Sequence, residues 1–142
     1  WDLLQWDTHK GVQRLVADLN KLLRSQPALY ELDFDGSGFE WVDCHNRDNS
    51  IVSFLRKAKN GDDSVLVCSN FTPVVRDSYR VGVPTQGWYR EILNSDSEYY
   101  GGSNVGNYPG ATATQPGHHG RPYCIDIALP PLGTVIFKRE DG

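Results

Sequence analysis

Ser64-Val65-Leu66-Val67-Cys68-Ser69-Asn70-Phe71 contains an uninterrupted apolar run from Val65 to Cys68. A short run of this kind is typical of a strand that lies in the middle of a sheet and is covered on both faces. Just before it, Asn60-Gly61-Asp62-Asp63 is rich in residues that accept the positive φ angles of tight turns. Together these residues predict a hairpin whose second strand is central.

The rest of the chain from Leu29 onward alternates apolar and polar residues, and turn-forming residues recur roughly every 8 to 12 positions. This pattern predicts a mainly β fold, an antiparallel β-sandwich of about eight strands. Asp35-Gly36-Ser37-Gly38 predicts a second hairpin connection. The predicted strands are residues 29–34, 39–44, 50–58, 64–71, 76–83, 88–93, 123–128 and 133–139.

The segment before these strands has a helical period. Apolar residues recur there at spacings of three and four, at Val12, Leu15, Val16, Leu19, Leu22 and Leu23. Thr8 can serve as the N-cap and Pro27 cannot continue a helix, so we predict one amphipathic α-helix at about residues 9–24. Its apolar face must be covered, because burying each aliphatic side chain is worth about 1.5 to 3 kcal/mol. The cover could be the chain's own sandwich or a second copy, or the face could be left without a good cover.

Composition narrows the class of protein. The 142 residues carry a net charge of -4 and no basic stripe, which argues against a nucleic-acid partner. No stretch approaches the ~20 apolar residues of a membrane span. A chain that starts at Trp1 and contains no methionine is expected to be a piece of a longer protein. Cys44, Cys68 and Cys124 show no CxxC spacing, which favours reduced thiols and a cytoplasmic location.

Residues 94–120 form a long segment of mainly Asn, Ser, Gly, Tyr and Pro. Connections are usually ~4 to 6 residues long, so a segment of this length indicates a function or disorder. Tyr99, Tyr100 and Tyr108 favour a function, because aromatic residues are unusual in disordered linkers. We expect this segment to dock against a neighbouring domain.

Trp41 is the candidate residue for contact with a sugar. Strand alternation over residues 39–44 predicts Phe39, Trp41 and Asp43 on one face. A flat indole can pack on the apolar face of a sugar ring, while a nearby carboxylate accepts hydrogen bonds from its hydroxyls. The alternative is that Trp41 and Phe39 belong to the sandwich core, and the residue pattern alone favours that alternative.

Other candidates have simpler structural explanations, so we expect no catalytic, cofactor or metal site. His118-His119 lacks a third ligand at suitable spacing, and Cys124 with His119 and Asp126 lacks the accessible setting of a nucleophile. The pairs Asp33 with Asp35 and Asp62 with Asp63 lie in predicted turns. For Trp1 and Trp6 packing is favoured, and Trp88 is ambiguous between packing and sugar contact.

Blocks of the sequence occur in a recognisable order: WDLLQW (1–6), HKGVQRLV (9–16), PALYELD (27–33), FEWVDC (39–44), CSNFTP (68–73), YGGSNVGN (100–107) and LPPL (129–132). They resemble the end of the catalytic barrel and the C-terminal region of a bacterial 1,4-α-glucan (glycogen) branching enzyme of the α-amylase superfamily. The resemblance covers essentially the whole chain.

The resemblance implies a non-catalytic role in a larger transferase. Branching enzymes cleave an α-1,4 glucan, hold the cleaved segment covalently on an aspartate and pass it to a 6-hydroxyl to form an α-1,6 branch. This retaining chemistry needs two carboxylates ~5 to 5.5 Å apart. In the family these lie on barrel strands N-terminal to the part represented here, so the chain alone is expected to be inactive.

The resemblance also implies a division of the chain and a set of partners. Residues 1–26 would be the last helix of the (β/α)8 barrel, and residues 27–142 the C-terminal all-β domain. The implied partners are the enzyme's own barrel and an α-glucan, glycogen or maltooligosaccharide, with Trp41 at a place where some family members hold glucan. The alternative function is an autonomous carbohydrate-binding module.

Overall fold

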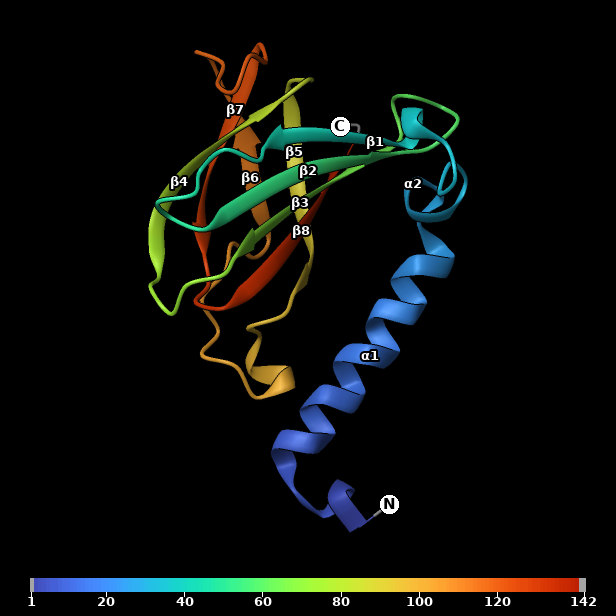
Figure 1. Ribbon diagram of the computed structural model, residues 1–142, viewed down its shortest axis with the longest axis vertical. Helices are drawn as coiled ribbons and strands as arrows, with labels where there is room; N and C mark the ends of the chain where they lie inside the picture. Colours follow the sequence, from blue (N-terminus) through green and yellow to red (C-terminus); the bar gives the residue numbers. More distant parts are fainter. Residues whose placement is uncertain (1, 141–142) are drawn as a thin grey trace.

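The computed structural model describes residues 2–140, which form two antiparallel sheets preceded by a long helix (Figure 1). The helices are η1 Asp2–Gln5, α1 Asp7–Ser25, α2 Pro27–Tyr30, η2 Gly36–Gly38 and η3 Glu98–Tyr100. The strands are β1 Phe39–Asp43, β2 Ile51–Lys57, β3 Ser64–Asn70, β4 Arg76–Val83, β5 Gly87–Asn94, β6 Gly110–Ala113, β7 Tyr123–Leu129 and β8 Gly133–Glu140. The predicted mainly β fold with a leading helix is confirmed.

The six-stranded sheet has the order β1-β2-β3-β8-β5-β6, and β4 and β7 form the second sheet. The predicted central strand is confirmed, since β3 pairs with both β2 and β8 and is buried over nearly its whole length. The β2–β3 hairpin is confirmed as well, with Lys57 opposite Ser64. The main core fills the space between the sheets and includes the fully buried Phe137, Leu55 and Ile125.

A second core lies on the outer face of the large sheet, where α1 and α2 pack. Ala28, Val67 and Ile136 are buried there, against Leu15 and Leu22 of α1. The helix therefore covers part of the sheet with one side. Among residues 2–140, no helix combines the length and the apolarity that crossing a membrane requires.

Three local predictions were wrong. Residues 29–34 do not form a strand: Pro27 takes the first position of α2, where its fixed φ and missing N–H suit a helix, and turns follow. The hairpin predicted at residues 35–38 is therefore absent, and these residues form η2 with the Asp35 side chain accepting the Ser37 N–H at 2.8 Å. Helix α1 begins at Asp7, with Trp6 rather than Thr8 at the N-cap.

The long segment contains structure that the prediction missed. The segment contains strand β6, which pairs with β5, and helix η3, which packs on α1. The Tyr100 hydroxyl donates to Asp18 at 2.6 Å, and the guanidinium of Arg14 lies 5.0 Å from the centre of the Tyr99 ring. Gly11 permits this close approach, because a Cβ there would clash with the Tyr100 carbonyl oxygen. The segment was expected to dock against a neighbouring domain, and in the structure its η3 part packs on α1 of the same chain.

Candidate functional site

Three aromatic rings form a cluster on the outer face of the large sheet, at its β1 edge. The ring centroids of Phe39 and Trp41 are 4.9 Å apart and nearly perpendicular, and those of Phe39 and Phe54 are 5.1 Å apart and stacked. Trp41 is 50% exposed and Phe39 is 38% exposed. These two residues therefore do not belong to the sandwich core, which was the alternative that the residue pattern favoured. We call Phe39, Trp41 and Phe54 the aromatic cluster.

Asp43 does not share this face, contrary to prediction. The register of β1 on β2 shifts between Trp41, which pairs with Phe54, and Asp43, which pairs with the buried Ser53. A bulge of this kind turns the residues after it to the other side of the strand, because the simple alternation of side chains is interrupted. The Asp43 side chain is only 12% exposed and points toward the second sheet.

The Asp43 carboxylate has a set of polar neighbours of its own. The Tyr79 hydroxyl donates to its Oδ2 at 3.1 Å, and the Nε2 of His119 lies 3.4 Å from the same oxygen. On the other side of the imidazole ring, the backbone N–H of Gly82 donates to Nδ1 at 3.2 Å. Burial raises the pKa of Tyr79 well above its usual range, so the phenol is a stable donor.

The stability of the chain should fall on mild acidification because of His119. Burial, with the charges of His118 and Arg121, lowers the pKa of His119 from 6.5, and the nearby Asp43 only partly opposes this. The unfolded chain then takes up a proton that the folded chain resists, so the free energy of unfolding rises with pH between the lowered pKa and about 6.5. Urea unfolding followed across this interval measures the effect.

The control for this effect is H119N, which removes the titrating ring and should flatten the profile in that interval. Glu40 contributes at lower pH, because its bond to Lys57 holds its pKa below 4.5 and its stabilisation is lost as pH falls through that lowered pKa. A free energy of unfolding that increases as the pH is lowered below 6.5 would contradict the role given to His119.

The aromatic cluster continues into the surface covered by α1. A row of residues directly opposite one another crosses five strands of the sheet, in the order Trp41, Phe54, Val67, Ile136 and Leu93. The last three are buried in the outer core with the leucines of α1, whereas Trp41 at the end of the row is open. The cluster is thus the exposed margin of the face on which the helix packs.

Helix α1 carries two apolar stripes rather than one. Gly11, Leu15, Asp18 and Leu22 face the chain's own sheet and η3 loop. The second stripe is rotated by about 100°, one residue along the helix. Its four side chains are 41% to 60% exposed: Val12, Val16, Leu19 and Leu23. We call this set the exposed stripe, and the chain's own sandwich does not cover it.

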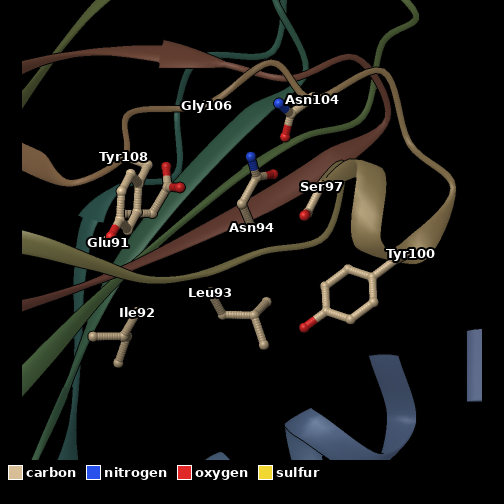
Figure 2. Close-up of a pocket in the computed structure, with 9 residues that line it drawn as sticks. All are labelled: Glu91, Ile92, Leu93, Asn94, Ser97, Tyr100, Asn104, Gly106 and Tyr108. Atoms are coloured by element: carbon tan, nitrogen blue, oxygen red, sulfur yellow. The ribbon is translucent and has the colours of Figure 1, made fainter. Parts of the chain in front are cut away.

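A cleft of about 530 Å³ lies between β5 and the long segment (Figure 2). Its polar residues already serve the loop: Glu91 accepts from the Asn107 backbone and side chain, and the Asn94 amide donates to the Val105 carbonyl. Burial raises the pKa of Glu91, against the lowering effect of Asn107. The cleft is therefore explained by support of the loop.

The family model of the alpha amylase C-terminal all-beta domain matches residues 41–140, most of the chain. The chain belongs to this family. The matched residues begin at Trp41 and run through β8, so the two sheets are those of an alpha amylase C-terminal domain.

Relatives of this alpha amylase C-terminal domain are 1,4-alpha-glucan branching enzymes. That of Rhodopirellula baltica is 59% identical over 99% of this chain and 19% of the relative. Those of Paramagnetospirillum magneticum and Aquifex aeolicus are 51% and 49% identical over 99% of this chain, and over 19% and 22% of the relatives. The chain spans about a fifth of the length of these relatives and matches their C-terminal portion. The resemblance to branching enzymes is confirmed.

Cys124 and His119 have structural roles in this alpha amylase C-terminal domain. Within residues 2–140, no group of three or more potential metal ligands occurs. Cys124 is buried and its thiol donates to the Pro116 carbonyl at 3.1 Å, while His119 is engaged with Asp43. Trp6 is exposed, and Trp1 lies outside the described residues. Trp88 is half-buried, and it pairs with Thr112 and Glu140 on the neighbouring strands.

Proposed function

We propose that the chain is the non-catalytic C-terminal part of a 1,4-α-glucan branching enzyme, which supports the catalytic barrel. Residues 1–26 would contribute the last helix of that barrel, and residues 27–142 the all-β domain. The observation that carries the proposal is the exposed stripe of α1, in a chain that is up to 59% identical to branching enzymes five times its length. A helix with a second apolar stripe needs a second neighbour.

The glucan contact is proposed at Trp41 and Phe39. Their rings are exposed, rigidly packed against Phe54 and open on one side, which suits them to stack on the apolar faces of glucose units. The Asp43 side chain lies on the opposite face of β1 from Trp41, so it would affect sugar binding only through the position of Trp41.

The exposed stripe favours this supporting role over an autonomous carbohydrate-binding module, because an independent module would not need to leave four aliphatic side chains open. We also propose a cytoplasmic location. It is supported by three free cysteines, Cys44, Cys68 and Cys124, which suit a reducing compartment.

The test compares the complete branching enzyme with the same enzyme lacking the region of this chain, using iodine staining of branched glucan. We expect the shortened enzyme to lose nearly all activity and solubility, because its barrel loses a helix. The 142-residue chain alone should show none. Branching by the isolated chain, or full activity of the shortened enzyme, would overturn the proposal.

A further inference from the structure

Strand β1 is an edge strand, since it pairs only with β2 in the large sheet. A tight turn of residues 118–121, from the segment between β6 and β7, lies against its far side. The turn is closed by the Arg121 N–H, which donates to the His118 carbonyl at 2.9 Å. His119 and Gly120 both have positive φ, 49° and 71°. The chain thus places a compact polar unit against the strand that carries Trp41.

The side chain of Arg121 is bonded to the backbone of Trp41. Its Nη2 donates to the Trp41 carbonyl oxygen at 3.0 Å and also bonds the carboxylate of Glu40, the preceding residue. Its Nη1 donates to the carbonyl of His119 at 3.1 Å, which ties the guanidinium to its own turn. The Arg121 side chain is only 12% exposed, which limits the access of water to its guanidinium group.

His119 holds the same strand on the other side of the bulge, through Asp43. The imidazole is fixed in turn by the Gly82 N–H from β4. A Cβ at Gly82 would clash with the His118 carbonyl oxygen, so the turn is wedged tightly between β1 and β4. Residues on both sides of Trp41 are therefore anchored to one turn.

We propose that Arg121 and His119 are positioning residues for the aromatic cluster, which fix the bulged strand so that the Trp41 indole is held ready to stack on a sugar ring. The inference rests on the glucan contact proposed at Trp41. An edge strand with a bulge is held in the sheet by few backbone hydrogen bonds. Anchoring it before binding reduces the entropy that glucan binding would otherwise cost.

The test uses R121M, which keeps an unbranched apolar stem but removes the donors of the side chain. The dissociation constant for maltoheptaose, measured by calorimetry on the 142-residue chain, should rise about three- to tenfold, the size of the net contribution of one ordinary hydrogen bond. In 5-fluorotryptophan-labelled protein, the fluorine signal of Trp41, assigned with W41F, should shift or broaden while that of Trp88 stays in place.

Two further variants separate positioning from stability. R121K keeps the charge beside Glu40 and should recover part of the affinity, and it serves as the readout if R121M does not fold. K138M removes a comparably shielded ion pair, with Asp63, away from the cluster. It should lower stability without moving the Trp41 signal.

The outcomes distinguish the two proposals. If W41A weakens binding but neither R121M nor R121K changes the affinity or the Trp41 signal, the positioning role is wrong and the glucan contact stands. If W41A leaves binding unchanged, the glucan contact is wrong, and an altered Trp41 signal in R121M still supports anchoring of the strand. An unaltered signal would then overturn both.

Discussion

Replacing Val12, Val16, Leu19 and Leu23 together by glutamine should leave the 142-residue chain folded but destabilise the complete branching enzyme severely. In the isolated chain these side chains are already about half exposed, so each change should cost only about 0.5 kcal/mol or less. Glutamine is also a good helix former. The sandwich and the packing of Leu15 and Leu22 remain untouched.

In the complete enzyme the same stripe would be buried by the barrel. Losing the remaining burial of four aliphatic side chains should cost about 3 to 6 kcal/mol in total. That is a large part of the 5 to 15 kcal/mol that typically stabilises a domain. Thermal unfolding and iodine-stained branching activity of the two proteins measure the difference.

The matched control is the pair L15Q and L22Q, on the stripe that faces the chain's own sheet. These changes should destabilise the isolated chain itself, because their side chains pack in its outer core. If the exposed-stripe variant of the complete enzyme unfolds and branches glucan like its parent, α1 is not a barrel helix. If the isolated chain dimerises and the variant does not, a second copy can occupy the stripe in the absence of the barrel.

W41A should weaken maltoheptaose binding to the 142-residue chain by about 10- to 30-fold, the size of effect that a central Trp typically has at a binding surface. The indole provides most of the open flat surface of the aromatic cluster, and Phe39 alone leaves a smaller one. W41F should have an intermediate effect, because it keeps a ring. Calorimetric titration measures all three proteins.

F71A is the control for W41A, because Phe71 is an exposed aromatic residue outside the aromatic cluster. It should bind like the parent chain. Equal affinities for W41A and the parent would show that the cluster serves packing against the barrel rather than glucan. Its place at the margin of the α1-covered face makes that the relevant alternative.

Much of the sandwich could be predicted because burial leaves a direct pattern in sequence. Val65 to Cys68 are apolar at successive positions since β3 is covered on both faces, and this needs no knowledge of its partners. Strand β6 escaped prediction because Gly110-Ala111-Thr112-Ala113 has only small side chains and lies within a polar segment. The strand predicted at residues 29–34 was wrong although apolar and polar residues do alternate there. Pro27 favours the start of a short helix, and this decides the backbone conformation.

The candidate site was predictable only in part, for a geometric reason. Exposure of Trp41 depends on which face of β1 is covered, and the alternation rule can name the faces but not choose between them. The turning of Asp43 comes from a bulge, which interrupts the rule at a single position. The bond from Arg121 to Trp41 joins residues 80 positions apart in the sequence, so no local pattern records it.

The attachment of α1 means that the proposed domain boundary near residue 26 is not a hinge. The middle of the helix is held by the η3 loop, through the close approach at Gly11 and the bond from Tyr100 to Asp18, and its C-terminal end by the bond of 2.7 Å from Lys138 to Gln26. Leu15 and Leu22 are seated on the sheet. The helix that we propose as the last helix of the barrel is therefore carried by the sandwich, and the two should move as one rigid body. A cut in the chain after residue 26 would leave the pieces associated.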